Sequence, residues 1–156
     1  GNGGHYENCT FAGAKVNGTG DFTGGIIGRV NHKGTTLTNL TNKGSVIGEN
    51  RTGGILGELA NNNVYNCYNE GTVSGAQDVG GIIGRITNTG NDSEIEIKGC
   101  ENNGTVESTK RCLGGICGYV SSNKNGKQIV SQSCSGDNLN TSTGECITYS
   151  TALLDN

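Results

Sequence analysis

The sequence contains no proline, methionine or tryptophan, and aromatic residues make up only 4% of its 156 residues. The lack of proline and of a Gly-X-Y period excludes a collagen-like triple helix. Hydrophobic residues amount to 31%, against about 45–50% in an ordinary globular domain. No run approaches the roughly 18 apolar residues of a membrane span. A broad, densely apolar helical core is therefore not expected.

Charge of either sign is sparse and scattered. Lysine and arginine number 11, and aspartate and glutamate number 14, which gives a net charge of −3. No stretch concentrates basic residues, and this disfavours nucleic acid and anionic membrane surfaces as partners. The length predicts one domain over residues 1–156. Because methionine is missing, we expect this domain to be a fragment of a larger protein.

Glycine, by contrast, is abundant, with 29 residues, and it recurs in a Gly-Gly-apolar-apolar-Gly motif. Four copies, at intervals of 29, 27 and 34 residues, occupy 24–28, 53–57, 80–84 and 114–118. A second motif alternates with the first and reads Asn-Cys-Tyr-Asn-Glu-Gly-Thr-Val at 66–73. It returns at 39–46 and 99–106, with degenerate copies at 8–9 and 133–134. Periods of this length are typical of solenoids, propellers and other arrays.

The repeat unit favours one of these architectures. Each unit holds two or three short β-type stretches separated by Gly and Asn, without the amphipathic runs of a helical solenoid. A propeller blade needs about 40–45 residues. We therefore predict an all-β fold, a right-handed parallel β-solenoid (β-helix) of about five rungs with a period of about 27–34 residues. Equivalent residues would stack in columns ~4.8 Å apart.

Five columns are expected to stabilise this stack. Three are apolar and would fill the core: Ile26, Ile55, Ile82, Ile116; Val30, Leu59, Ile86, Val120; and Val46, Val73, Val106. The column Cys9, Leu40, Cys67, Cys100, Cys134 is expected to be buried, since Leu replaces Cys within it. In the fifth, Asn42, Asn69 and Asn102 would hydrogen-bond along the axis. Gly44, Gly71 and Gly104, two residues later, are predicted to supply turns with positive φ.

One apolar column does not fit a simple alternation. Ile27, Leu56, Ile83 and Cys117 would point outward if the strand alternated regularly. Either a bulge at Gly28 and its equivalents, where we expect a bend or a close backbone approach, changes the parity, or an apolar stripe faces a partner. Arg29, Glu58 and Arg85 are expected to alternate in sign on the outer face.

Insertions concentrate at one corner of the predicted rung. The interval from the last Gly of the first motif to the Leu/Cys column takes 12, 10, 16 and 16 residues in successive units. The two long loops would be neighbours, and such insertions often map to a binding face. The candidate ligand-binding residues are Asn88, Asn91, Asp92, Ser93, Asn123, Lys124, Asn125 and Lys127.

The two motifs resemble the GLUG-motif family of bacterial surface and secreted proteins. The copies that carry the resemblance are Gly80-Gly-Ile-Ile-Gly84 and Asn66-Cys-Tyr-Asn-Glu-Gly-Thr-Val73, and it covers roughly residues 22–120. Such repeats look like β-solenoid segments of adhesin-like proteins and of the non-catalytic part of IgA-specific metallopeptidases. The resemblance implies an extracellular, cell-surface setting and supplies no catalytic residues.

The seven cysteines have three interpretations. Most look like stacked core residues. Cys112 and Cys146 are 34 residues apart, the same interval as Cys100 to Cys134. They should therefore stack on adjacent rungs, within disulfide range, and could staple the last rung. A zinc site is the weakest interpretation, because no Cys-x-x-Cys pair is present and His5 and His32 lie in unrelated places. No metal and no cofactor is predicted.

The sequence contains no recognisable catalytic motif: His-Glu-x-x-His, Gly-x-Ser-x-Gly and the P-loop are all missing. The leading hypothesis is a non-catalytic adhesion module that binds a glycan or protein through the loop corner, with further domains of the parent protein flanking it. The alternatives are a structural stalk and a glycan-cleaving enzyme. The carboxylates Asp78, Asp92, Glu94 and Glu96 are most simply solubilising charges, and Tyr65, Tyr68 and Tyr119 are the mid-chain rings on which a sugar could stack.

Overall fold

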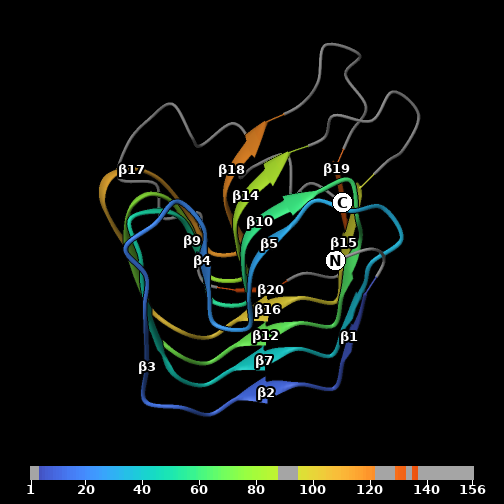
Figure 1. The fold of residues 1–156 in the computed structure, drawn as a ribbon, viewed down its shortest axis with the longest axis horizontal. Helices are drawn as coiled ribbons and strands as arrows, with labels where there is room; N and C mark the ends of the chain where they lie inside the picture. The colour runs from blue at the N-terminus through green and yellow to red at the C-terminus, as the bar shows by residue number, and fades with distance from the viewer. Residues whose placement is uncertain (1–3, 88–94, 122–128, 133–134, 137–156) are drawn as a thin grey trace.

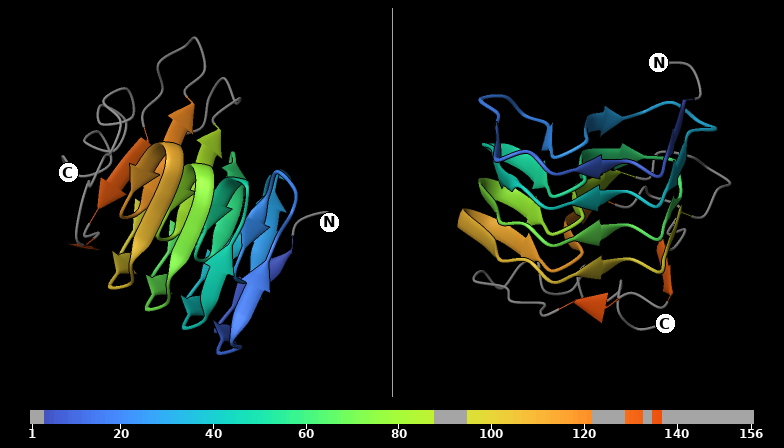
Figure 2. Two further views of the ribbon diagram at one scale, coloured as in Figure 1. Left: turned by 90° about the vertical axis from the view of Figure 1, so that its left-hand side faces the viewer. Right: turned by 90° about the horizontal axis from the view of Figure 1, so that it is seen from below.

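The computed structural model describes residues 4–87, 95–121, 129–132 and 135–136, which form strands and no helix. These residues build a parallel β-solenoid of about four turns (Figures 1 and 2). In Figure 1 the N-terminal turn is nearest the viewer, and the chain runs clockwise from β1 through β2 and β3 as it recedes, so the coil is right-handed. The predicted solenoid is confirmed, with about four turns rather than about five. None of the described residues belongs to a helix that could cross a membrane.

The strands stack into four parallel sheets, named A to D. Sheet A contains β1 (His5–Glu7), β6 (Thr36–Thr38), β11 (Val64–Tyr65), β15 (Ile95–Lys98) and β19 (Ile129–Gln132). Sheet B contains β2 (Thr10–Phe11), β7 (Thr41–Asn42), β12 (Tyr68–Asn69), β16 (Glu101–Asn102) and β20 (Ser135–Gly136). Sheet C contains β3 (Lys15–Asn17), β8 (Ser45–Ile47), β13 (Val73–Gly80), β9 (Asn50–Gly53) and β4 (Thr23–Gly24), and β17 (Val106–Gly114) pairs with β13. Sheet D contains β5 (Ile27–Val30), β10 (Leu56–Ala60), β14 (Ile83–Thr87) and β18 (Cys117–Ser121).

Each turn passes through sheets A, B and C and then folds back before it enters sheet D (Figure 1). This return segment consists of β4, β9 and the second halves of β13 and β17, residues 77–80 and 111–114. In Figure 1 it lies between β3 and the strands of sheet D. As a result the solenoid encloses two cores instead of one.

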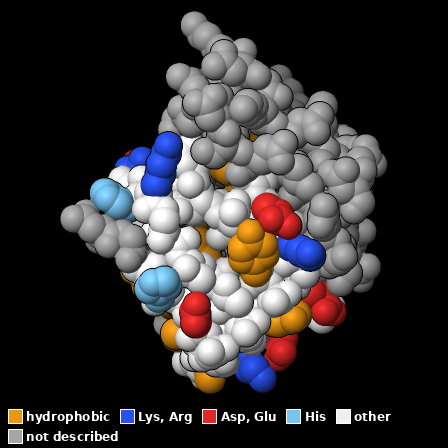
Figure 3. Space-filling view, turned by 90° about the vertical axis from the view of Figure 1, so that its right-hand side faces the viewer, with side chains coloured by type: hydrophobic (Ala, Val, Ile, Leu, Met, Phe, Trp, Pro, Cys, Tyr) orange, Lys and Arg blue, Asp and Glu red, His pale blue; other side chains and the backbone are white. Residues whose placement is uncertain are grey.

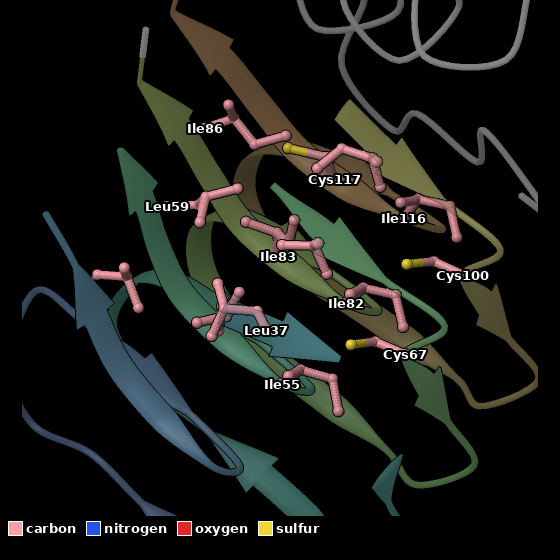
Figure 4. Close-up of a cluster of buried hydrophobic side chains, with 14 of the residues drawn as sticks. Leu37, Ile55, Leu59, Cys67, Ile82, Ile83, Ile86, Cys100, Ile116 and Cys117 are labelled. Atoms are coloured by element: carbon pink, nitrogen blue, oxygen red, sulfur yellow. The ribbon is translucent and has the colours of Figure 1, made fainter. Parts of the chain in front are cut away.

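The larger core lies between sheet D and sheets A and B (Figure 4). It contains the predicted columns of Ile55, Ile82 and Ile116 and of Val30, Leu59, Ile86 and Val120. The smaller core joins Val46 and Val73, from the first half of sheet C, to Val79 and Leu113 of the return segment. The predicted apolar columns are therefore confirmed, but they fill two separate cores.

The predicted asparagine column is a continuous hydrogen-bonded ladder. Asn42 Nδ2 donates to Asn69 Oδ1 at 2.7 Å, and Asn69 Nδ2 donates to Asn102 Oδ1 at 2.8 Å. Each amide also donates to the carbonyl oxygen two residues on, as Asn69 does to that of Gly71 at 3.0 Å. The first motif touches this ladder, because a methyl group on Gly54 would lie 2.6 Å from Asn69 Oδ1. The second glycine of the motif thus lets the chain turn directly against the ladder.

The prediction of positive φ at Gly44, Gly71 and Gly104 is wrong. Among the described glycines only Gly34 and Gly99 have positive φ. Gly71 is needed for another reason: a methyl group there would collide with the carbonyl oxygen of Gly44 in the preceding turn. One column of positive φ lies instead between sheets A and B, at Asn8, Asn39, Asn66 and Gly99, and a second lies in the return segment, at Arg51, Asp78 and Cys112. Asn and Gly are the residues that adopt this conformation most readily.

The column of Ile27, Leu56, Ile83 and Cys117 is buried in the larger core, so the outward apolar stripe is wrong. Leu56 and Leu59 both face this core, whereas Gly57 and Glu58 both face the return segment. The alternation of inward-facing and outward-facing side chains is therefore interrupted at Gly57 and its equivalents. Every turn has the same interruption, so the strands of sheet D stay in register. A methyl group on Gly57 would lie 2.6 Å from the backbone nitrogen of Thr23, which confirms the close approach.

Candidate functional site

The predicted binding loops leave sheet D and enter sheet A at one corner, called the D/A corner here. Thr87 of β14 pairs with Ser121 of β18, and Ile95 of β15 pairs with Ile129 of β19. The segments 88–94 and 122–128 are thus anchored at both ends on neighbouring turns. The predicted ligand-binding residues themselves lie outside the described residues: Asn88, Asn91, Asp92, Ser93, Asn123, Lys124, Asn125 and Lys127.

Earlier turns show how the chain is held at the D/A corner. Asn62 is buried; its Oδ1 accepts a hydrogen bond from the backbone N–H of Thr35, and its Nδ2 donates to the carbonyl oxygen of His32 at 2.7 Å. Asn63 Oδ1 accepts from the backbone N–H of Glu96 at 2.8 Å. Amide side chains therefore bind one turn of this corner to the next, so the loop anchors lie on a well-supported frame.

The outer face of sheet A begins beside this corner and is polar. At its centre the half-buried Tyr65 donates a hydrogen bond to Glu96 Oε2 at 3.0 Å, between Thr38 and Lys98 on neighbouring strands. Burial, followed by the bond to Glu96 and the charge of Glu96, raises the pKa of Tyr65. Figure 3 faces this side and shows charged groups of both signs scattered among uncharged ones.

A second cluster fills the space between the return segment and sheet D, and is called the charged seam here. The return segment supplies Phe22, Arg51 and Asp78 in one register column. Sheet D supplies Arg29, Glu58, Arg85 and Tyr119 in another. The prediction that Arg29, Glu58 and Arg85 lie on an outer face is wrong for Glu58, whose side chain is 5% exposed. The return segment covers this face of sheet D.

Ion pairs and cation–π contacts connect the two columns of the seam. Glu58 lies 2.9 Å from Arg29 Nε and 3.3 Å from Arg51 Nη1. Both guanidinium groups also stand over the Phe22 ring, 4.8 and 4.9 Å from its centroid. Neighbouring turns thus share one carboxylate and one ring.

The second ion pair of the seam joins Arg85 Nη2 to Asp78 Oδ2 at 2.9 Å, and Arg85 also stands over the Tyr119 ring. Burial raises the pKa of Asp78, and the charges of Arg85, Arg111 and Arg51 oppose that shift. Arg51 and Asp78 adopt positive φ, 50° and 53°. The repeats in the sequence did not reveal the column of Phe22, Arg51 and Asp78, because each turn has a different residue at this position.

The cysteines differ in environment. Leu40, Cys67 and Cys100 are buried as predicted, whereas Cys9 is exposed, because no earlier turn among the described residues covers it. A hydrogen bond with Cys100 lowers the pKa of Cys67, and burial raises the pKa of Cys117 to about 12. Cys112 is disulfide-bonded; its predicted partner Cys146 lies outside the described residues, and so does Cys134.

The structure separates the described candidates for catalysis. Asp78 is buried in the charged seam, and Glu96 lies on sheet A, where it holds Tyr65. These two carboxylates therefore do not form a pair, while Asp92 and Glu94 lie outside the described residues. Within the described ranges, no group of three or more His, Cys, Asp or Glu side chains could hold a metal ion.

Comparison with protein-family models, with curated proteins and with solved structures finds no match to this chain.

Proposed function

We propose that this domain is a non-catalytic binding module of a bacterial surface protein, and that it binds a glycan or protein outside the cell through the D/A corner. The observation that carries the proposal is the register of the loop anchors, Thr87 with Ser121 and Ile95 with Ile129. It brings the two longest insertions of the repeat to neighbouring turns. Loops on a rigid scaffold are where binding residues concentrate.

The scaffold also suits presentation of these loops. Asn62 and Asn63 join the turns at the corner, and the asparagine ladder joins them at the opposite side of the larger core. The repeat motifs resemble those of surface and secreted proteins, and the resemblance supports the extracellular setting. A purely structural stalk remains the alternative that the experiment must separate from binding.

The test is a binding screen of the folded domain against arrays of host and bacterial glycans and extracellular-matrix proteins. A variant replaces residues 123–127 with a short Gly-Ser turn. The matched control is the double variant Lys43→Ala/Glu70→Ala, which removes an exposed ion pair from another side of the solenoid. We expect a specific hit that the loop variant loses and the control keeps. No hit with folded protein favours the stalk, and turnover of a glycan favours the enzyme.

A further inference from the structure

Three of the four arginines of the chain, Arg29, Arg51 and Arg85, belong to the charged seam, and the fourth, Arg111, lies beside it in the next register column of the return segment, close enough for its charge to act on Asp78. Register places one in each of four successive turns, with Arg29 on β5, Arg51 on β9, Arg85 on β14 and Arg111 on β17. In the sequence they are 22 to 34 residues apart, so no basic cluster is visible there. The fold therefore turns scattered residues into a row of guanidinium groups along the solenoid axis.

The row has more positive charge than the seam neutralises. Glu58 serves both Arg29 and Arg51, and Asp78 pairs with Arg85. Arg111 donates from Nε to an uncharged acceptor, Gln77 Oε1, at 3.2 Å. The register column of Arg111 also contains Asp21, whose Oδ1 accepts a hydrogen bond from Asn50 Nδ2 at 2.9 Å. Four cations against three anions leave an excess of one positive charge, while the chain as a whole has a net charge of −3. The seam is thus locally positive on an otherwise acidic molecule.

The excess charge is accessible to solvent. The Arg29 side chain is 45% exposed and that of Arg51 is 28% exposed, and Arg111 is also exposed. The ion pairs engage one nitrogen each of Arg29 and Arg51. A guanidinium group has five N–H donors in a planar fork, which suits bidentate binding of an oxyanion. Stacking on Phe22 holds two of these groups in place.

We propose that the arginine row of the charged seam binds a linear anionic polysaccharide lying along the solenoid axis. Successive turns repeat at ~4.8 Å, close to the length of one sugar residue in an extended chain, and four turns span roughly 14 Å. One guanidinium group per turn would therefore meet acidic groups on successive sugars. This site is separate from the D/A corner, and neither proposal depends on the other.

The aromatic rings argue for a polysaccharide over a nucleic acid. Single-stranded nucleic acids bind by stacking bases on free ring faces. In the seam, Arg29 and Arg51 cover Phe22, and Arg85 covers Tyr119. The rings orient guanidinium groups and offer little surface to a base, whereas carboxylate or sulfate groups need only the guanidinium groups.

The test is affinity electrophoresis of the folded domain at low ionic strength in gels containing polygalacturonate, which has one carboxylate per sugar. Neutral dextran, dextran sulfate and a single-stranded DNA oligonucleotide serve as parallel probes. The test variant is Arg29→Gln/Arg111→Gln, which changes the exposed ends of the row and leaves the pair of Asp78 with Arg85 intact. The control is Lys15→Gln/Lys98→Gln, which removes the same charge from exposed positions on sheets C and A.

We expect retention by polygalacturonate but not by dextran, and at least about tenfold weaker binding in the arginine variant, since a charge-assisted hydrogen bond contributes roughly a factor of ten. The lysine control should change binding less than about twofold. Retention by dextran sulfate alone would identify sulfate as the recognised group and would still support an anionic polysaccharide as the ligand. No retention by either anionic glycan, equal losses in both double variants, or tighter binding to the oligonucleotide would overturn the proposal. If the glutamine variant does not fold, Arg29→Lys/Arg111→Lys keeps the charge and removes the fork, and it should also bind more weakly.

Discussion

The asparagine ladder, which is buried, and the charged seam, which is partly exposed, are both stacks of polar side chains, but they follow opposite rules. The ladder places the same residue, Asn42, Asn69 and Asn102, in three successive turns. An amide both donates and accepts, so identical copies satisfy one another. A guanidinium group only donates and a carboxylate only accepts, so stacked copies of either would repel. A solenoid can therefore repeat a buried polar residue only if that residue complements itself.

The two stacks share one feature: each meets an aromatic ring in the first turn. Phe11 pairs in register with Asn42, and the Phe22 ring lies under Arg29 and Arg51. These are the two phenylalanines of the chain. Terminal units of repeat proteins commonly depart from the consensus sequence. In the first turn of this solenoid, a phenylalanine occupies the position that a polar side chain has in the next turn of each stack.

The largest expected effect comes from breaking the self-complementarity of the ladder. Asn69→Asp keeps the shape but turns a donor into an acceptor that faces Asn102 Oδ1 and the carbonyl oxygen of Gly71. Because the site is fully buried, we expect a loss of about 4 kcal/mol in the free energy of unfolding, or failure to fold. Urea unfolding at neutral pH measures it. The control Asn66→Asp, on an exposed asparagine, should stay within about 0.5 kcal/mol, and equal losses would show that burial does not decide the effect.

The next effect tests the complementary pairing of the seam. Glu58→Ala removes the carboxylate shared by Arg29 and Arg51. Because both arginines are partly exposed and can be rehydrated, we expect a loss of about 2 kcal/mol, less than for a fully buried pair. Glu70→Ala breaks a 3.4 Å pair with Lys43 whose side chains are both 51% exposed, and it should cost below about 0.5 kcal/mol. Similar losses in the two variants, measured by urea unfolding, would contradict the role of the seam.

The smallest effect concerns pH and Asp78. Burial raises the pKa of this carboxyl group above its ordinary value of 3.8, so the folded state holds the proton more tightly than the unfolded chain. The stability that this adds is complete below pH 3.8 and is lost as pH rises through the raised pKa. We expect Asp78→Asn to gain stability relative to the parent protein over this window. Unfolding curves of both proteins from acidic to neutral pH measure the difference, and a constant difference would contradict the shift.

Repeat spacing was enough to predict the columns of Ile55, Leu59, Val73 and Asn69, because equivalent residues of parallel turns must stack. For the column of Leu56 it left two alternatives open, a bulge that turns the column into the core and an outward apolar stripe, since the shift of alternation at Gly57 depends on how closely the return segment approaches. The column of Asn39, Asn66 and Gly99 did contain a signal. Exchange of Asn for Gly is typical of positive φ, which these residues have.

The sequence by itself determined the parallel solenoid, its period and its asparagine ladder, because these depend on identical residues meeting at one spacing. Only the tertiary structure decided the return segment, the division into two cores and the charged seam. The seam joins Arg29 and Arg51 through Glu58 and pairs Arg85 with Asp78, so no residue type repeats from turn to turn. The pairs of Arg51 with Glu58 and of Arg85 with Asp78 arise where the return segment faces sheet D, and the spacing of repeats contains no record of that geometry.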